Sequence, residues 1–219
     1  YNEKTLWSGG PQPDSTDYNG GNYQDRYKVL VEIRKALEAG DRQKAKQLAE
    51  RNLVGPNNAQ YGRYLAFGDI FMVFNNQKKG LDTVTDYHRG LAISEAITTT
   101  SYTQDGTSFK RETFSSFPDD VTVTHLSKKG DKTLDFTLWN SLTEDLIANG
   151  DYSWEYSNYK QGAVTTDSNG ILLKGTVKDN GLQFASYLGI KTDGQVTAQD
   201  GYLTVTGASY ATLLPSAKT

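Results

Sequence analysis

The stretch that decides the fold is residues 182–205, LQFASYLGIKTDGQVTAQDGYLTV. Its apolar side chains recur at every second position, first at Leu182, Phe184, Leu188 and Ile190, with Ser186 interrupting the series, and then at Leu203 and Val205. A period of two is typical of β-strands with one buried face. The dipeptides Asp193-Gly194 and Asp200-Gly201 favour tight hairpin turns, because both residue types tolerate positive φ. The stretch therefore predicts antiparallel strands joined by short turns.

The same alternation recurs along the chain from Phe67 onward. It is seen at Phe71 and Val73, at Leu91 and Ile93, at Val121 and Val123, and at Leu134, Phe136 and Leu138. Further turn dipeptides separate these runs, namely Asp105-Gly106, Asn149-Gly150, Asn169-Gly170 and Asn180-Gly181. Two stacked sheets bury such stripes economically, since each sheet then has one packed face. We expect a mainly β fold, an antiparallel sandwich in which these stripes face the core.

One region, about residues 23–54, has a helical period instead. Tyr27, Leu30, Val31, Ile33 and Leu37 recur at the spacing of one helix face, and Ala45, Leu48 and Ala49 form a narrower second stripe. Gly40 suits the left-handed position after a first helix, Asp41 suits the N-cap of a second, and Gly55-Pro56 would end it. The pattern predicts an inserted αα-hairpin. Leu30, Leu37 and Leu48 are expected to be buried against the sandwich or each other.

Composition excludes several classes of function. The chain has 219 residues and a net charge of -3, which gives no reason to expect binding of nucleic acid, since that requires a basic face. It contains no cysteine, which rules out disulfides and thiolate chemistry, and no apolar run approaches the roughly 20 residues of a membrane span. The first residue is Tyr1 and the only methionine is Met72. We therefore expect a piece or processed product of a longer protein, with any secretion signal upstream.

Residues with catalytic or metal-binding chemistry are sparse. The two histidines, His88 and His125, form no metal-ligand spacing, and His125 is in phase with Val121 and Val123. It is interpreted as a sheet histidine with one hydrogen bond. No GxSxG motif occurs. Candidate carboxylates for glycoside hydrolysis are Glu3, Glu112, Asp119, Asp120, Glu144, Asp145 and Glu155, but none can be paired from sequence. We expect no catalytic residue, metal or cofactor in this chain.

A cluster of aromatic residues allows two interpretations. Tyr152, Trp154 and Tyr156 alternate, so on a strand they would present three rings on one face and could stack on sugar rings. They are the candidate carbohydrate-binding residues. Such ladders also pack sheets against neighbouring layers, because each ring removes a large apolar area from water.

Several motifs, in order, resemble the N-terminal domain of glycoside hydrolase family 95, the bacterial α-L-fucosidases. The segment Asn2-Glu3-Lys4-Thr5-Leu6-Trp7-Ser8-Gly9-Gly10-Pro11 resembles the family's NE-x-TLWSGGP signature. Further on, the chain is similar at Ile33-Arg34-Lys35-Ala36-Leu37, Leu65-Ala66-Phe67-Gly68-Asp69-Ile70, Tyr87-His88-Arg89-Gly90-Leu91 and Phe109-Lys110-Arg111-Glu112-Thr113-Phe114-Ser115-Ser116. The likeness covers nearly the whole chain, although strands that normally precede Tyr1 and everything after the sandwich are absent.

This resemblance implies a β super-sandwich that packs on a catalytic (α/α) barrel of the same polypeptide. It implies inverting hydrolysis of terminal α-1,2-linked L-fucose by acidic groups on that barrel, none of which maps onto this chain. It also implies a secreted or cell-surface bacterial protein, with fucosylated glycans as a candidate second partner. Asn2, Glu3 and Trp7 are the candidate docking residues. The alternatives are an independent carbohydrate-binding module and a structural spacer of a surface protein.

Overall fold

A computed structural model describes residues 1–9, 25–53, 62–75, 83–143 and 160–219. The chain divides into two compact units. The sandwich unit comprises Tyr1–Ser8 and Arg63–Thr219, and the hairpin unit comprises Gly9–Gly62. The hairpin unit is inserted between two paired residues of the sandwich unit: the backbone N–H of Ser8 donates to the carbonyl of Arg63 over 2.9 Å. Each unit is described by itself below.

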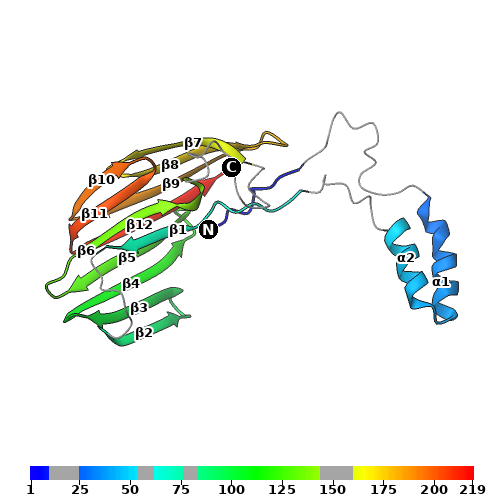
Figure 1. The fold of residues 1–219 in the computed structure, drawn as a ribbon, viewed down its shortest axis with the longest axis horizontal. Coiled ribbons are helices and arrows are strands. Elements are labelled where there is room, and N and C mark those ends of the chain that lie inside the picture. The colour runs from blue at the N-terminus through cyan, green and yellow to red at the C-terminus, as the bar shows by residue number, and fades with distance from the viewer. Residues whose placement is uncertain (10–24, 54–61, 76–82, 144–159) are drawn as a thin grey trace. The chain divides into compact units, whose positions relative to one another are not determined.

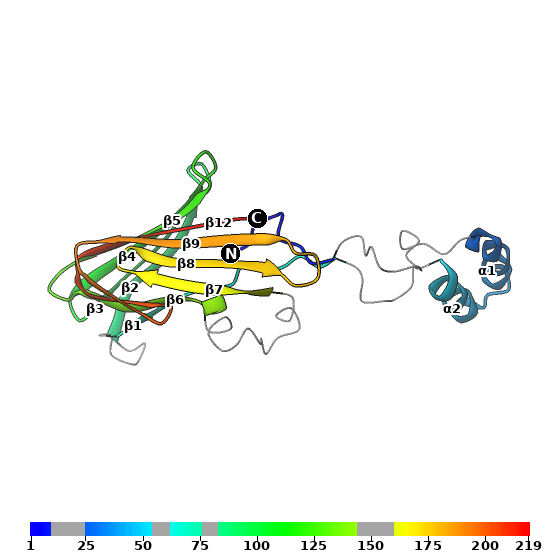
Figure 2. The same ribbon diagram turned by 90° about the horizontal axis from the view of Figure 1, so that it is seen from above.

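The sandwich unit has two antiparallel sheets (Figures 1 and 2). The smaller is four-stranded, in the order β1 (Ile70–Phe74), β6 (Leu134–Asn140), β11 (Tyr202–Ala208) and β10 (Gln195–Gln199). The larger is eight-stranded, in the order β2 (Val84–Ala92), β3 (Ile97–Gln104), β4 (Thr107–Ser116), β5 (Val121–Lys129), β12 (Tyr210–Lys218), β9 (Gln183–Thr192), β8 (Gly170–Val177) and β7 (Lys160–Asp167). The expected mainly β sandwich is confirmed.

The main core lies between the two sheets. Strand β6 alternates as its sequence predicts: Leu134, Phe136 and Leu138 are buried. They pack with Leu203 and Val205 of the neighbouring strand β11 and with apolar residues of the facing sheet, among them Ile171, Leu188, Ile190 and Leu213. Removing a side chain the size of Phe136 from water stabilises the fold by roughly 1.5–3 kcal/mol. The alternating stripes therefore hold the sheets together.

Two of the expected stripes do not face the core. In β1 the buried face is Ile70, Met72 and Phe74, whereas Phe71 and Val73 are exposed. The run IFMVF is apolar on both faces, so its period of two could not indicate which face is covered. Leu91 and Ile93, in and just after β2, are also exposed, because β2 is an edge strand that lies outside the four-stranded sheet.

The turn predictions have mixed outcomes. Asp105-Gly106 (φ 48° and 75°) and Asp200-Gly201 (φ 46° and 84°) have the two positive φ angles of a type I′ turn and join β3 to β4 and β10 to β11, as expected. Asp193-Gly194 does not close a hairpin, because β9 and β10 belong to different sheets. There the chain crosses from the eight-stranded to the four-stranded sheet.

The remaining turn dipeptides are shifted or only half as predicted. Gly170 already belongs to β8, where it pairs with Asp167 of β7, so residues 168 and 169 form that turn. At Asn180-Gly181 only Gly181 has positive φ, in a loop closed by a 2.8 Å hydrogen bond from the backbone N–H of Val177 to the carbonyl of Leu182. Asn149-Gly150 lies outside the described residues.

The N-terminal segment closes one end of the sandwich. Leu6, Leu65 and Phe67 are fully buried and form a second cluster with Val177 and Phe184. The amino group of Tyr1 donates to the carbonyl of Gly68 over 2.6 Å, and the Tyr1 hydroxyl contacts Ser186 and accepts from Asn140 over 3.1 Å. Burial raises the pKa of this hydroxyl, which the two hydrogen bonds oppose. The raised pKa favours the neutral form of the Tyr1 phenol.

The hairpin unit contains the expected pair of helices. A short 3-10 turn, η1 (Arg26–Val29), leads into α1 (Leu30–Glu38), and α2 (Arg42–Asn52) follows. Gly40 has φ 77°, and the backbone N–H groups of Gly40 and Asp41 donate to the carbonyls of Leu37 and Ala36. This is the Schellman arrangement. The Asp41 carboxylate accepts from the backbone N–H of Lys44 over 2.9 Å, so both predicted caps are confirmed. Gly55-Pro56 lies outside the described residues.

The apolar contacts of the hairpin are fewer than predicted. Ile33, Ala36 and Ala45 are buried, and Leu30 and Leu48 pack partly against them. Leu37, however, is 54% exposed, so its predicted burial is wrong. It lies in the last turn of α1 and is not part of the apolar cluster around Ile33, Ala36 and Ala45. Within the described ranges, no helix is both long and apolar enough to cross a bilayer.

Candidate functional site

The candidate carboxylates that lie in the described residues do not form a catalytic pair. Each has a local partner: Glu3 accepts from the backbone N–H of Thr5, Glu112 pairs with Lys110, Asp119 accepts from Ser116, and Asp120 pairs with Lys218. Glu144, Asp145 and Glu155 lie outside the described residues. Glycoside hydrolysis needs a proton-donating acid and a second carboxylate that flank one glycosidic bond. None of these contacts brings two candidate carboxylates together in that way.

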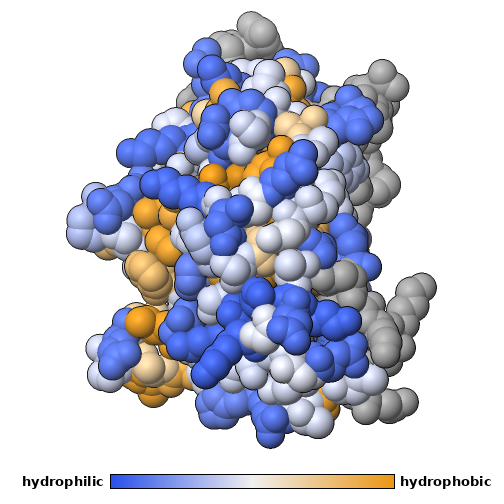
Figure 3. Space-filling view, turned by 90° about the vertical axis from the view of Figure 1, so that its left-hand side faces the viewer, coloured by the Kyte–Doolittle hydropathy of each residue, from blue (hydrophilic) through white to orange (hydrophobic). Residues whose placement is uncertain are grey.

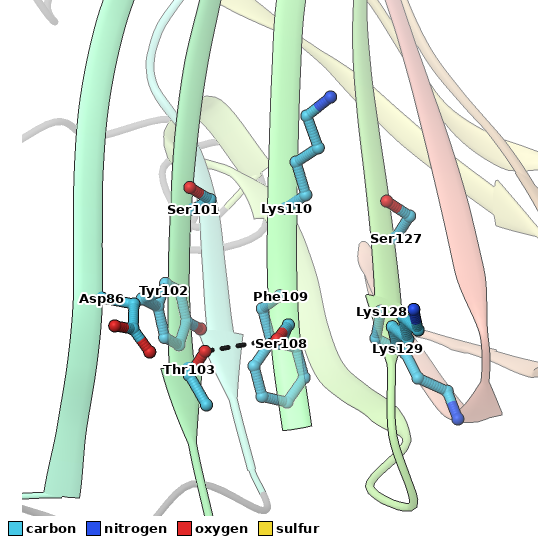
Figure 4. Close-up of a pocket in the computed structure, with 10 residues that line it drawn as sticks. All are labelled: Asp86, Ser101, Tyr102, Thr103, Ser108, Phe109, Lys110, Ser127, Lys128 and Lys129. Atoms are coloured by element: carbon cyan, nitrogen blue, oxygen red, sulfur yellow. Dashed lines mark hydrogen bonds between the residues drawn. The ribbon is translucent and has the colours of Figure 1, made fainter. Parts of the chain in front are cut away.

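A hollow in the described part of the sandwich holds about 420 Å³ and lies over β2 to β5 (Figure 4). Its one acidic lining residue is Asp86. Lys110 extends away from Asp86 toward its partner Glu112, and Lys128 donates to the carbonyl of Gly130 over 2.8 Å. A 3.2 Å bond between Thr103 and Ser108 links two strands of the lining. The polar groups do not converge on one point.

The histidines do not build a metal centre. Nδ1 of His125 lies 2.9 Å from Oγ1 of Thr212 on β12, which confirms the interpretation of a sheet histidine with one hydrogen bond. His88 is an exposed residue of β2. Among the residues that the structure describes, no three His, Cys, Asp or Glu side chains lie close enough to share a metal ion.

The candidate docking residues lie in the segment that closes the sandwich. Trp7 is 47% exposed although its neighbours Leu6 and Ser8 are buried, so the indole points outward and not into the core. The Trp7 ring lies 5.3 Å from that of Tyr64, and its Nε1 donates to the carbonyl of Lys4 over 2.8 Å. The backbone is fixed as well, because Asn180 donates to the carbonyl of Trp7. Trp7 is therefore a held, exposed aromatic residue.

The other two docking candidates are less prominent. Asn2 is exposed, and Glu3 is half-buried with its carboxylate bound to the backbone and hydroxyl of Thr5. Both belong to the segment that carries Trp7. The candidate sugar-binding residues Tyr152, Trp154 and Tyr156 lie outside the described residues.

A row of aromatic rings that sequence reasoning missed crosses the outer face of the four-stranded sheet. Phe71 of β1 pairs with Trp139 of β6, and their rings stack at 5.3 Å. Trp139 in turn lies 5.6 Å from Tyr202 of β11. Phe71 is 43% exposed. The three residues are far apart in sequence, and only the strand register brings them together.

Exposed apolar residues gather at one end of the sandwich, which we call the termini end and define by Tyr1, Thr219 and the strand ends beside them. Thr5 and Thr219 are in contact through their hydroxyls, and Lys218 pairs with Asp120 over 3.2 Å. Asp120 belongs to the β4–β5 turn, whose Phe117 is 96% exposed, and Ile93 in the β2–β3 turn is 86% exposed. Trp7 and Tyr64, which pair in an isolated β-bridge, lie at the same end. So does the aromatic row, because Trp139 directly precedes Asn140, which is hydrogen-bonded to Tyr1.

The opposite end has a different character. Its turns include Asp105-Gly106, Gly130 and Asp193-Gly194, which are polar or small. Figure 3 shows this end as mostly hydrophilic, with small and separate hydrophobic areas. The two ends of the sandwich therefore differ in how much apolar surface they expose.

The fold and this surface define a class of protein: a two-sheet β-sandwich domain with an exposed aromatic end. All residues, 1–219, match the model of the N-terminal domain of glycosyl hydrolase family 65, and the chain belongs to that family. It is 24% identical over 240 residues to Alpha-L-fucosidase 2 of Arabidopsis thaliana, with 99% of this chain and 25% of the relative covered. The chain thus spans about a quarter of the length of this curated relative.

A solved structure is also similar. It is a protein from the human microbiome that has been proposed to be a kojibiose phosphorylase, with 12% sequence identity and a TM-score of 0.49 over 72% of this chain and 23% of the other. The expected kinship with a glycoside hydrolase N-terminal domain is confirmed by the family match and the fucosidase relative. The chain is an N-terminal domain of a glycoside hydrolase.

Proposed function

We propose that this chain is the non-catalytic β-sandwich of a secreted α-L-fucosidase and that its termini end docks on a catalytic (α/α) barrel of the same polypeptide. The barrel, the α-1,2 linkage of the fucose and the secreted location come from the resemblance stated on the sequence. The name of the Arabidopsis relative supports fucosidase chemistry in the longer protein. The docking surface is argued from the structure.

The observation that carries the docking proposal is where the exposed apolar residues lie. Trp7, Tyr64, Phe71, Ile93 and Phe117 are all exposed at the end that holds Thr219. In an enzyme with such an N-terminal domain, we expect the catalytic domain to come later in the polypeptide, which favours docking at the end that holds Thr219. Aromatic residues are enriched at the centres of protein interfaces, and a cluster of exposed ones marks an interaction surface.

The test measures how tightly the chain associates with the remainder of the full-length protein. The chain and the remainder of the protein would be produced separately, and their association measured by calorimetry. We expect Phe117→Ser and Trp7→Ala each to weaken association by about tenfold or more, as truncation of a central aromatic anchor does. Tyr87→Ser is the control, since Tyr87 is also an exposed aromatic residue, at 62%, but lies in the part of β2 that faces the opposite end.

Stability measurements on the isolated chain separate docking from folding. Phe117 is almost fully exposed, so Phe117→Ser should leave the thermal midpoint of the chain unchanged. If Trp7→Ala lowered the stability of the isolated chain by as much as it weakened association, the indole would be a structural cap and the docking role of Trp7 would be lost.

A second candidate function is an independent carbohydrate-binding module. The row Phe71, Trp139 and Tyr202 favours it, because aromatic rings on an open sheet face can stack on sugars. The rings stack on one another, however, and so turn part of their faces inward. A glycan array on the isolated chain distinguishes this candidate, since docking alone predicts no glycan signal that depends on Trp139.

A further inference from the structure

The eight-stranded sheet is wider than the four-stranded sheet that packs on it. Strands β2, β3 and β4 extend past β1 at the edge of the sandwich (Figures 1 and 2). Phe109 and Leu126 of β4 and β5 are buried in the core, so residues in phase with them belong to the same face. Beyond the core this face continues as an open surface of mostly polar residues, with the exposed Leu91 at its edge.

Two arginines lie on that open face, Arg89 on β2 and Arg111 on β4, with β3 between them. Arg89 pairs with Thr100, and Thr100 pairs with Arg111, so the three side chains share one face of the sheet. The Cα atoms of the two arginines are separated by two strand spacings, about 10 Å. Arg111 stands at the margin of the core, where it lines a small gap with Phe74 and Leu134. We call Arg89, Thr98, Thr100, Arg111 and Thr113 the arginine shelf.

The guanidinium groups of the shelf have unmet hydrogen-bonding capacity. Nε of Arg111 is buried and has no hydrogen-bond partner among the described residues. Neither Arg89 nor Arg111 forms an ion pair with a carboxylate in the described part of the chain; Glu112, the acidic neighbour, is bound to Lys110 on the other face of β4. A buried donor without a partner is destabilising, and most such donors in proteins are satisfied. The arrangement is complementary to an anion with two oxygens.

Hydroxyl groups surround the two arginines. Thr98, Thr113 and Thr124 form the next row across β3, β4 and β5, with Leu91 of β2 at its edge. The Thr113 and Thr124 hydroxyls are 3.0 Å apart, and Thr98 donates to the carbonyl of Thr113 over 3.2 Å. Each hydroxyl can make more hydrogen bonds than these, because it has one donor and two acceptor positions. The shelf therefore offers hydroxyl partners beside a charged clamp.

We propose that the arginine shelf binds an acidic saccharide, with the carboxylate of a uronic acid residue between Arg89 and Arg111 and the ring hydroxyls on the threonine row. A planar guanidinium matches a carboxylate through two parallel hydrogen bonds, which a neutral sugar does not accept with the same strength. A peptide carboxylate would use the arginines but leave the threonine row unused. The shelf shares no residue with the docking residues of the termini end, and its test uses the chain without the barrel, so either proposal can fail without the other.

The test measures binding of trigalacturonate to the chain by calorimetry at low salt. We expect saturable binding that weakens as NaCl is added, because the contact is between opposite charges. Arg89→Gln and Arg111→Gln should each weaken it by about tenfold or more, the loss that removal of one charged hydrogen-bonding partner produces. Arg111→Lys keeps the charge but loses Nε and the planar fork, so it should also weaken binding.

Three controls make the result decisive. Lys110→Gln removes a positive charge from the same strand on the opposite face and should leave binding unchanged. The methyl ester of trigalacturonate keeps the hydroxyls without the charge and should bind at least about tenfold more weakly. Triglutamate carries carboxylates without sugar rings. Arg89 is exposed on an edge strand, so Arg89→Gln tests the site even if Arg111→Gln fails to fold.

The proposal is overturned by any of three results. Trigalacturonate could show no saturable binding, it could bind Arg89→Gln as tightly as the unaltered chain, or triglutamate could bind as tightly as trigalacturonate. The last result would assign the shelf to an acidic protein segment instead of a saccharide.

Discussion

At the scale of single residues, Asp193 links the two crossings between the sheets. It lies where the chain passes from β9 to β10, and its carboxylate accepts from the hydroxyl of Ser209 and from the backbone N–H groups of Ser209 (2.8 Å) and Tyr210 (3.2 Å). Ser209 lies between β11 and β12, where the chain crosses back. The hydrogen bond from the Ser209 hydroxyl is the main cause that lowers the pKa of Asp193 below its usual 3.8, with the backbone bonds adding to it.

The lowered pKa of Asp193 predicts a pH-dependent contribution to stability. Because the pKa is lower in the folded than in the unfolded chain, the carboxylate stabilises the fold above its ordinary value of 3.8. That contribution is lost as the pH falls through the lower, folded-state pKa. Asp193→Asn should therefore be less stable than the unaltered chain at pH 7, and the difference should shrink toward pH 2.

Urea unfolding at several pH values measures this difference. Asp105→Asn serves as the control, since Asp105 lies in the two-residue turn between β3 and β4 of one sheet and does not link two sheet crossings. A stability difference between Asp193→Asn and the unaltered chain that stayed constant from pH 7 to pH 2 would mean that the carboxylate charge is not the stabilising feature.

At the scale of elements, the helical hairpin depends on a small apolar contact. Its buried residues are Ile33, Ala36 and Ala45, and large apolar side chains such as Val31 and Leu37 are exposed. Isolated helices of this length are marginal in water, so packing of the helices on each other must supply most of their stability. The Schellman turn at Gly40 and the Asp41 cap fix the angle between them.

We predict opposite results for two substitutions on α1. Ile33→Ala removes the largest buried side chain of the hairpin and should destabilise it by about 2–5 kcal/mol. Leu37→Ala should change stability by about 0.5 kcal/mol or less, because Leu37 is exposed. Helical circular dichroism during thermal unfolding measures both. Equal losses from the two variants would show that Leu37 has an apolar partner in the folded protein.

At the scale of the whole molecule, the proposed function assigns the catalytic groups to another domain of the same polypeptide. Of the candidate carboxylates, Glu3, Glu112 and Asp120 are each bound to a neighbouring group. An inverting glycosidase holds its two groups roughly 6.5–9.5 Å apart around one sugar. The proposed docking surface at the termini end would place the sandwich beside the domain that supplies those groups.

The chain alone should release no fucose from a 2′-fucosylated oligosaccharide, while the complete protein should. The measurement is free fucose after long incubation at high protein concentration. Turnover by the chain that disappeared in Glu3→Gln or Glu112→Gln would place the active site in the sandwich and contradict the proposed division of labour.

The sequence by itself determined what depends on neighbouring residues. The strands around Leu134, Phe136 and Leu138, the caps at Gly40 and Asp41, and the turn at Asp105-Gly106 followed from local period and from the φ angles that Gly and Asp tolerate. The sandwich class followed from many such strands, because alternating stripes must be buried against one another. The ordered motifs likewise pointed to a glycoside hydrolase N-terminal domain, which the family match bears out.

Only the tertiary structure decided what depends on strand register and on which sheet covers which face. A local pattern could not predict three features: the covered face of β1, the crossing at Asp193-Gly194 and the exposure of Leu37. The row of Phe71, Trp139 and Tyr202 and the pairing of Arg89 with Arg111 across Thr100 join residues far apart in the chain. The alternation of apolar residues describes the geometry of one strand, whereas these features depend on how separate strands are aligned with one another.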